Sequence, residues 1–342
     1  MKEFVISPNE AGQRFDKYLG KLLSGTSMSF VFKMLRKKNF TLNDRKAAGN
    51  EILCVGDHVK LFLSDETFDK FSAGRNEIWQ DQFPADCSPE VLNRHRLFIV
   101  YEDPDILIFN KPAGMLSQKA AAQDVSVNEY LIGYLLQQKK INIEEMATFR
   151  PSIANRLDRN TSGLILCGKS LAGLQYLSEI IKNRTLEKYY RCIVSGAMDQ
   201  SLMIEGYLTK DTVNNQVYIS QKPSGDEASW IKTGIDPIGQ YTFRGKPYTE
   251  LQVHLITGKP HQIRAHLSSI GHPVIGDHKY GAGLNCSLTK QCHIRRQLLH
   301  AYMVVFPKTE GRFAYLNGKK FVAAFPGDYE RARKELLHGN ME

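Results

Sequence analysis

Charge is distributed unevenly along this 342-residue chain, and the pattern predicts more than one structural unit. From Arg14 to Lys60 there are ten basic and four acidic residues, a net charge of +6. From Ser64 to Glu90 the balance reverses to seven acidic and two basic residues, with few aliphatic side chains and several turn formers. We therefore expect a small basic domain at residues 1–63, an acidic linker at 64–90 and a larger domain at 91–330.

Composition excludes several classes of protein. Hydrophobic residues make up 42% and charged residues 24% of the chain, which is typical of a soluble globular protein. The longest stretch without Asp, Glu, Lys or Arg, Ala265 to Gly276, is shorter than the roughly 20 apolar residues of a membrane span. The N-terminus lacks the apolar core of a signal peptide. We expect a cytoplasmic protein whose net charge of +9 favours a polyanionic partner and no membrane.

The cysteines and histidines are not spaced as metal ligands. None of the six cysteines forms a Cys-x-x-Cys pair, and the gap of five residues between Cys286 and Cys292 is unlike that of zinc sites. Four histidines between residues 261 and 278 lie five or six residues apart, so they cannot share one helix face. We expect no metal, and thiols that stay reduced in the cytosol.

The basic unit is predicted to contain two short helices followed by strands. The first helix begins near Arg14, since apolar residues recur there at helical spacing. Thr26, Ser27 or Ser29 can cap the second, and strands are expected at Phe40–Leu42 and Val59–Leu63. Taken alone, the run Arg36, Lys37 and Lys38 is a solvated helix end. The order RFDKYLGKLL, SFVFKMLRKKNFTLND and GDHVKLFL, however, resembles the S-four-like (αL) RNA-binding domain, which implies that this run contacts RNA.

In the larger unit, predicted strands and helices interleave without a regular βαβ period, which indicates an α+β domain. Helices are expected after Ser126, after Ser170 and from Pro260 to near Gly271. The expected strands are Phe98–Tyr101, Ile106–Asn110, Leu164–Cys167, Tyr189–Val194 and Tyr248–Ile256.

Two polar clusters could carry chemistry. In the first, residues 155–163 (NRLDRNTSG), Asp158 lies among arginines that keep a carboxylate ionised, as a nucleophile or base requires. The alternative is a turn cap or a structural ion pair. In the second, residues 257–267 (TGKPHQIRAHL), a helix starting at Pro260 places His261 and Arg264 on one face. From that face Arg264 could bind a carboxylate with two hydrogen bonds.

Together, five segments resemble the RluA-type RNA pseudouridine synthases. LIFNKPAG, RLDRNTSGLIL, KYYRCIVSG, TGKPHQIRAHLSSIGHPVIGD and QLLHA occur in family order between about Phe98 and Pro307. The resemblance implies a pseudouridine synthase fold, with a mixed and largely antiparallel sheet flanked by helices. An S-four-like domain at the N-terminus is also common in this family.

The resemblance also implies roles for individual residues. Asp158 matches the essential aspartate, and Arg264 matches the arginine that pairs with it, so we expect the two side chains within salt-bridge reach. Tyr190 matches the tyrosine that stacks on the target base. Leu299 matches the wall of the base pocket, and Arg156 a residue that holds the flipped nucleotide. Asn155 departs from the histidine of many relatives.

The expected reaction converts uridine to pseudouridine in structured RNA without redox change or group acquisition, so it requires no cofactor. Large-subunit ribosomal RNA is the expected substrate, and transfer RNA is the alternative. A non-catalytic ribosome-assembly factor is a rival interpretation, and it would be expected to have lost Asp158. A metal-dependent hydrolase would need convergent carboxylates that the sequence lacks. A covalent sugar adduct, a covalent base adduct and a glycal route all use the same aspartate. No obligate protein partner is implied, and a monomer would suffice.

Overall fold

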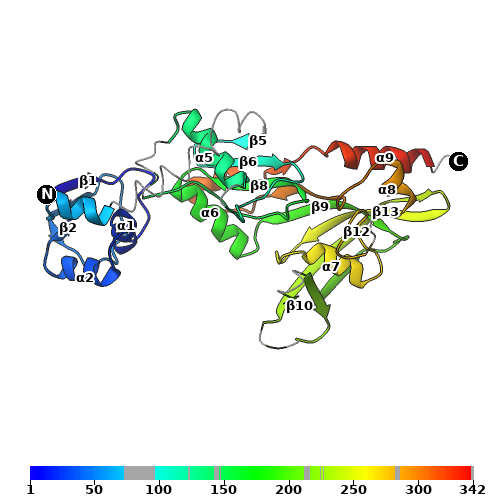
Figure 1. Cartoon of the computed structure of the whole chain (residues 1–342), viewed down its shortest axis with the longest axis horizontal. Coiled ribbons are helices and arrows are strands. Elements are labelled where there is room, and N and C mark those ends of the chain that lie inside the picture. Colours follow the sequence, from blue (N-terminus) through cyan, green and yellow to red (C-terminus); the bar gives the residue numbers. More distant parts are fainter. Residues whose placement is uncertain are drawn as a thin grey trace.

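A computed structural model describes residues 1–72, 97–121, 124–141, 146, 148–211, 216–223, 225, 227–281 and 286–339. The molecule is elongated, with a small N-terminal unit at one end and the helix α9 (Gly327–Gly339) at the other (Figure 1). No helix in the described parts of the chain is both long and apolar enough to cross a membrane.

The N-terminal unit packs two helices against a four-stranded sheet of order β1-β4-β2-β3. Both helices form where the sequence predicts them, and the N-cap of α2 is Ser27, whose Oγ accepts a hydrogen bond from the Phe30 N–H at 3.3 Å. The helical spacing of apolar residues buries Phe15, Leu19 and Leu22 in the core of the unit. The elements are β1 (Lys2–Val5), α1 (Phe15–Leu22), α2 (Met28–Arg36), β2 (Phe40–Leu42), β3 (Arg45–Lys46) and β4 (His58–Leu61).

The structure differs from the expected linker, residues 64–90, at the N-terminal end of this segment. Residues 65–72 are helical, and Phe68 and Phe71 of this helix pack against the core of the N-terminal unit. The two aromatic side chains supply enough apolar surface for packing, although the acidic composition of the segment predicts an exposed linker. The helical stretch therefore belongs with the N-terminal unit, and the remainder of the expected linker, from residue 73, lies outside the described residues.

The larger unit is built on an eleven-stranded sheet, which confirms the expected mixed and largely antiparallel fold. The main path is β11-β10-β12-β13-β9-β14-β8-β6-β5, with β15 beside β14 and β7 beside β8. The strands are β5 (Phe98–Glu102), β6 (Ile106–Lys111), β7 (Ser152–Ile153), β8 (Ser162–Gly168), β9 (Glu187–Ser195), β10 (Leu202–Asp211), β11 (Gln216–Ser220), β12 (Ser229–Phe243), β13 (Lys246–Leu255), β14 (Leu299–Val305) and β15 (Lys320–Val322). In the described part of the chain, β8 and β14 pair in parallel and the other strand pairs are antiparallel.

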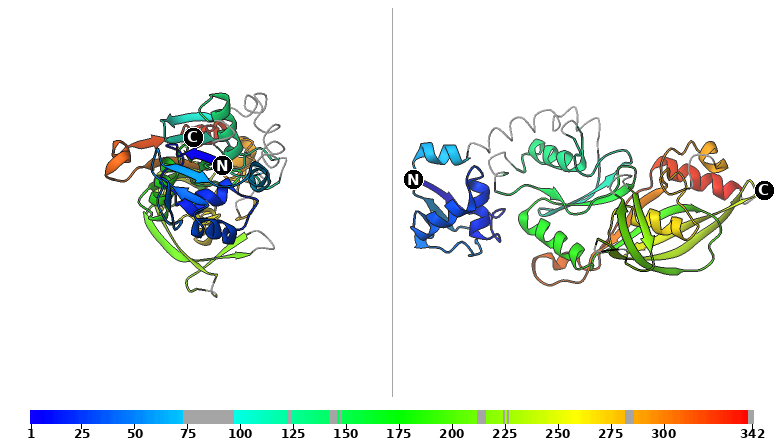
Figure 2. Two further views of the ribbon diagram at one scale, coloured as in Figure 1. Left: turned by 90° about the vertical axis from the view of Figure 1, so that its left-hand side faces the viewer. Right: turned by 60° about the horizontal axis from the view of Figure 1, so that its bottom comes forward.

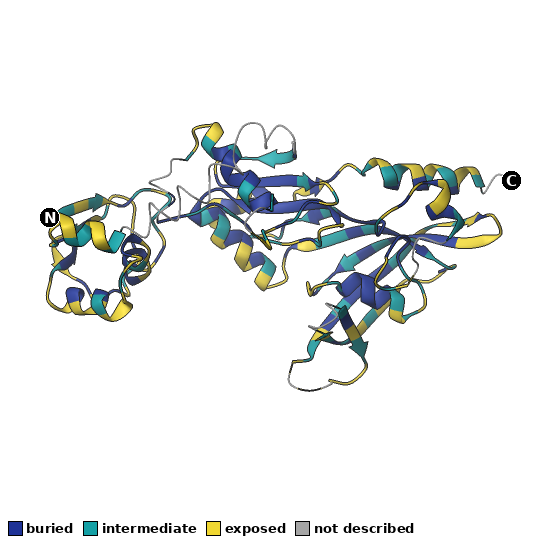
Figure 3. Ribbon diagram, viewed as in Figure 1, coloured by how far each residue is buried: buried dark blue, intermediate teal, exposed yellow. Residues whose placement is uncertain are grey.

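Helices cover both faces of the sheet at its centre. Because successive side chains of a strand point to opposite faces, Phe109 of β6 joins the core beneath α5 whereas Ile108 joins the core beneath α6. The strand β8 is consequently buried along its whole length, and Figure 3 shows the buried band. The helices are α5 (Val127–Gln137), α6 (Leu171–Lys182), α7 (Gln262–Ser269), α8 (Ser287–Gln291), α9 and a 3-10 helix (Gly311–Leu316). The helix α7 packs through Ala265 on the strands β10 to β12 (Figure 2).

Glycine is required where β8 begins. Gly163 pairs with Ala301 of β14 and has a φ of +116°, a backbone conformation that favours glycine. A Cβ atom at this position would overlap the carbonyl oxygen of Ala301 and lie 2.6 Å from its nitrogen. The close approach of the two strands lies directly after the polar loop that carries Asp158.

We expect Gly163→Ala to lower the free energy of unfolding by about 3 kcal/mol or more, since backbone strain and overpacking add together. The matched control is Gly271→Ala, at a φ of +83° with open space around the added methyl. It should cost only about 1 kcal/mol. Urea denaturation of both variants measures the difference, and equal losses would contradict the packing argument.

Candidate active site

The loop that carries Asp158 joins β7 to β8, and a second loop, residues 111–117, holds its backbone in place. The Ser117 hydroxyl accepts a hydrogen bond from the Leu157 N–H at 2.9 Å and donates one to the Leu157 carbonyl at 2.8 Å. On the other side of Asp158, the Gly114 N–H donates to the Arg159 carbonyl at 2.8 Å. The residues before and after the aspartate are thus fixed by the segment that follows β6.

Lys111 joins the two loops from inside the protein. Its side chain is fully buried, and its ammonium group donates to the carbonyls of Pro112, Met115 and Arg159 at 2.9–3.1 Å. Burial lowers the pKa of Lys111 to about 7, and the charge of Arg296 adds to the effect. Because Lys111 binds three carbonyl groups, it holds the loop of residues 111–117 against the loop that carries Asp158.

Arg264 of α7 connects Asp158 to a second carboxylate. Its Nη1 donates to Oδ2 of Asp158 at 2.9 Å, which confirms the expected ion pair. Its Nε and Nη2 donate to the two oxygens of Asp277 at 2.6 and 2.9 Å. The arginine and Asp277 are buried, whereas the side chain of Asp158 is 27% exposed. Among the described residues, none hydrogen-bonds Oδ1 of Asp158, so this oxygen is available to a substrate.

His261 also approaches the aspartate, but not from a helix face. Its φ is +53°, and α7 begins after it at Gln262, so the expected start at Pro260 is wrong by two residues. Its Nε2 lies 3.8 Å from Oδ2 of Asp158, and its Nδ1 is 2.9 Å from the Tyr280 hydroxyl. Burial lowers the pKa of His261, which favours a neutral ring beside the Asp158–Arg264 pair.

Tyr190 and Leu299 supply apolar surface next to the loop. Tyr190 of β9 pairs with Ala301 of β14, two residues after Leu299, and both side chains join the core cluster that contains Leu157. Burial, and then the charge of Asp158, raise the pKa of the Tyr190 phenol well above its ordinary value. The tyrosine is therefore protonated at neutral pH and is an uncharged aromatic surface.

The remaining predicted site residues lie on the surface. Arg156 is exposed two residues before Asp158. The three basic residues 36–38 are exposed at the end of α2, and the structure does not bring them to Asp158. Asn155 hydrogen-bonds the backbone of β8, since its Oδ1 accepts from the Leu166 N–H at 2.8 Å and its Nδ2 donates to the Leu164 carbonyl at 3.3 Å. Asn155 therefore anchors the loop that carries Asp158 to β8.

Sequence reasoning missed two members of the site. Asp277 and Lys111 both stand in segments that carry the family resemblance, yet nothing in their spacing assigns them a partner. Asp277 ends the IGD sequence thirteen positions after Arg264, and only the fold brings the two together. Among the described residues, no group of three or more His, Cys, Asp or Glu side chains is arranged to hold a metal ion.

We expect Asp277→Asn to lower the free energy of unfolding at pH 7 by about 3 kcal/mol, because it leaves one charge of a buried pair uncompensated. Burial alone would raise the pKa of Asp277, but hydrogen bonds and the charge of Arg264 lower it below its ordinary value of 3.8. The contribution of the Asp277–Arg264 pair to the free energy of unfolding is therefore present above pH 4, and it is lost as the pH falls through the lowered pKa of Asp277.

Urea denaturation from pH 7 to pH 2 measures both effects. The control Glu205→Gln breaks the exposed pair with Lys232 and should leave stability nearly unchanged. An Asp277→Asn protein as stable as the wild type at pH 7 would contradict the buried-pair argument.

The chain is similar in sequence to known RNA pseudouridine synthases. Residues 105–269 match the family model of RNA pseudouridylate synthase. The chain is 28% identical over 327 residues to ribosomal large subunit pseudouridine synthase D of Borreliella burgdorferi, covering 95% of this chain and 89% of that protein. It is 30% identical to an uncharacterized RNA pseudouridine synthase of Mycoplasma genitalium, covering 90% of each.

Among solved structures, human RNA pseudouridylate synthase domain containing 4 has the same fold. Its TM-score is 0.56 at 19% identity, covering 72% of this chain and 95% of that one. With the fold shared and the sequence similarity extending over nearly the whole chain, the chain belongs to the RNA pseudouridine synthase family and is a pseudouridine synthase.

Proposed function

We propose that Asp158 is the catalytic aspartate and that the substrate is large-subunit ribosomal RNA. The observation that supports the catalytic role is the hydrogen bonding of the Asp158 carboxylate. One of its oxygens accepts a hydrogen bond from the buried Arg264, and the other is free among the described residues. A carboxylate fixed on one side and open on the other can attack or take a proton without reorganising.

The chemistry balances within the nucleotide. The bond from N1 of uracil to C1′ of the ribose breaks, the uracil turns, and a bond from C5 to C1′ forms while C5 loses its proton and N1 gains one. Asp158 serves as a nucleophile towards the sugar or the base, or as a base in a glycal route. Each route needs an ionised carboxylate, and the Arg264 guanidinium donates a hydrogen bond to the carboxylate of Asp158. We infer no cofactor for this isomerisation.

Tyr190 and Leu299 are suited to hold the flipped uracil. A base leaves its stack at a cost of a few kcal/mol, and stacking on an aromatic ring offsets about 1–3 kcal/mol of this. Because the Tyr190 phenol stays protonated, we assign it stacking and hydrogen bonding in the resting enzyme. Arg156, exposed in the loop two residues before Asp158, is proposed to contact a phosphate of the same nucleotide.

The N-terminal unit, expected at residues 1–63 and extended by the helix at 65–72, is proposed to bind RNA as an S-four-like domain. The catalytic domain, expected at 91–330, extends through α9, whose Tyr329, Ala332 and Leu336 pack on its core. The two helices, antiparallel sheet and exposed cations Arg36, Lys37 and Lys38 of the N-terminal unit support its assignment to RNA binding. A ribosomal substrate is supported by relatives that are named for the large ribosomal subunit. We place the enzyme in the cytoplasm, acting as a monomer, with transfer RNA as the second candidate substrate.

We expect Asp158→Asn to reduce pseudouridine formation at least about a thousandfold, because the amide can neither attack nor take a proton. The assay is tritium release from RNA transcribed with uridine labelled at C5, using ribosomal and transfer RNA separately. The matched control is Asp199→Asn, which changes an exposed aspartate between β9 and β10 and should keep wild-type activity.

Release of tritium by the Asp158→Asn protein at the wild-type rate would refute the proposed catalytic role. Release from transfer RNA alone would replace the proposed substrate. Tight binding without release from either RNA by the wild-type protein would instead support the non-catalytic assembly factor.

A further inference from the structure

The N-terminal unit contains a hollow that is not part of the active site. It lies between α2 and residues 46–51 and has a volume of about 770 Å³. Such a volume is within the range of about 300–1,000 Å³ that is typical of small-ligand sites. Phe32 and Arg36 of α2 line one side, and Lys46, Ala47 and Glu51 line the other.

Phe32 presents its ring at the surface of this hollow. It is 38% exposed, while its helix neighbours Val31 and Leu35 are buried in the core. Gly49 lies beneath the ring: a Cβ there would be 3.3 Å from Cε1 of Phe32 and 3.0 Å from Leu35. Because residue 49 has no side chain, the Phe32 ring packs closely over its backbone on one side and stays partly exposed on the other.

The cations at this hollow are free to bind an anion. Arg36 and Lys46 are exposed and form no ion pair with any described residue. The one carboxylate of the lining, Glu51, accepts hydrogen bonds from the Ala48 and Gly49 N–H groups at 2.6 and 2.7 Å. Burial raises the pKa of Glu51, but these backbone hydrogen bonds outweigh it, so the carboxylate is ionised and satisfied without the two cations.

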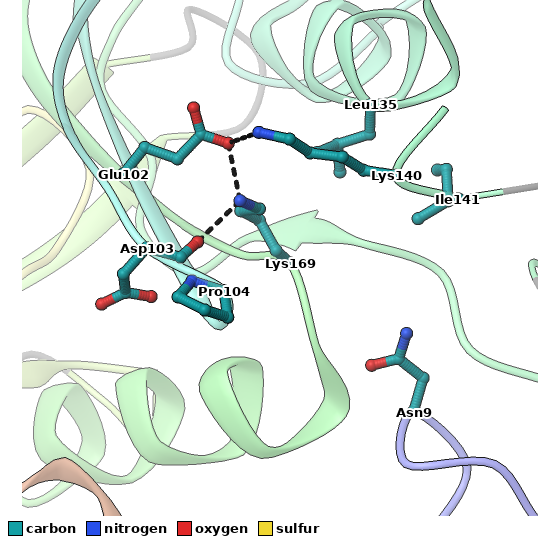
Figure 4. A pocket seen from close by; sticks show the side chains of 8 residues that line it. All are labelled: Asn9, Glu102, Asp103, Pro104, Leu135, Lys140, Ile141 and Lys169. Atoms are coloured by element: carbon teal, nitrogen blue, oxygen red, sulfur yellow. Dashed lines mark hydrogen bonds and ion pairs between the residues drawn. The ribbon is translucent and has the colours of Figure 1, made fainter. Parts of the chain in front are cut away.

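Another hollow is lined by Asn9 and by residues of the larger unit, and its two lysines already have partners (Figure 4). Lys140 and Lys169 each donate to Glu102 at 2.6 Å, and Lys169 also donates to the Asp103 carbonyl. Although burial raises the pKa of Glu102, the hydrogen bonds from both lysines bring it down to about 2. The two lysines are therefore held in a structural ion-pair network with Glu102, so neither ammonium group is free to bind a ligand.

We propose that the hollow at Phe32 binds one unpaired nucleotide of the RNA substrate, with the base stacked on Phe32 and the adjoining phosphates held by Arg36 and Lys46. An exposed ring flanked by unpaired cations is the combination that recognises single-stranded RNA. A base inside a duplex cannot offer its face to the ring. The inference rests on the proposed function, and it adds a single-stranded binding site outside the active site.

The first test is fluorescence anisotropy of the full chain with a labelled single-stranded RNA oligonucleotide of mixed sequence. Phe32→Ala should weaken binding about tenfold, since a base–aromatic stack is lost. Phe32→Tyr, which keeps the ring, should restore most of the affinity. Phe62→Ala removes a phenylalanine that is 50% exposed elsewhere in the same unit and should change nothing. Thermal melting checks that each variant is folded.

The salt dependence of RNA binding distinguishes the contribution of the Phe32 ring from that of the cations. Arg36→Gln removes one phosphate contact, so the slope of log K against log salt should become about 0.7 less steep, whereas Phe32→Ala should leave the slope unchanged. Lys334→Gln, on the exposed side of α9 at the far end of the molecule, is the control for loss of general charge. Equal slopes for Arg36→Gln and the wild type would overturn the phosphate assignment.

The outcomes also separate this inference from the proposed function. Wild-type affinity in Phe32→Ala, together with normal tritium release by the wild-type protein, would refute the nucleotide site and leave the proposed function intact. Loss of binding in Phe32→Ala, with no release from any RNA by the wild-type protein, would support the site and refute the proposed activity. Tighter binding of a duplex than of the single strand would also overturn the inference.

Discussion

The active-site geometry depends on one buried arginine held between two carboxylates. Taking the Arg264 guanidinium out of water is costly unless its donors are satisfied, and Asp277 satisfies two of them from a fully buried position. Asp277 is itself fixed by the backbone N–H groups of Lys279 and Tyr280. One of the three other N–H donors, on Nη1, is thereby aimed at Asp158, which stays partly exposed and keeps one oxygen free among the described residues.

The same aspartate is positioned from the opposite side by backbone contacts. Lys111 and Ser117 bind the carbonyls of Arg159 and Leu157, on either side of Asp158, and the close approach of β8 to β14 at Gly163 fixes where the loop must end. Strand pairing then places Tyr190 and Leu299 beside the loop. Charge from α7, hydrogen bonds from the loop after β6 and an aromatic ring from β9 thus converge on one carboxylate, although these segments are distant in sequence.

Local features of the fold and the identity of the central pair could be predicted from the sequence, because periodicity and motif order report on them directly. The helices beginning at Phe15 and Leu171 and the strand at Phe40 follow from apolar spacing and caps. The left-handed backbone of His261 could not be predicted, because Pro260 favours a helix start and only tertiary contact overrides it. The role of Asp277 depends on a turn that brings it back to Arg264, and the helix at residues 65–72 depends on two aromatic contacts in an acidic segment.

The central claim, that Asp277 acts on catalysis by holding Arg264 against Asp158, is tested most directly by a double-mutant cycle on kcat. The variants are Arg264→Gln, Asp277→Asn and the two combined, assayed by tritium release from the RNA that the wild type modifies. Residues that act through one another lose activity non-additively, so the double variant should be no slower than Arg264→Gln alone. Losses that multiply would mean that Asp277 acts independently of Arg264, and they would contradict the account.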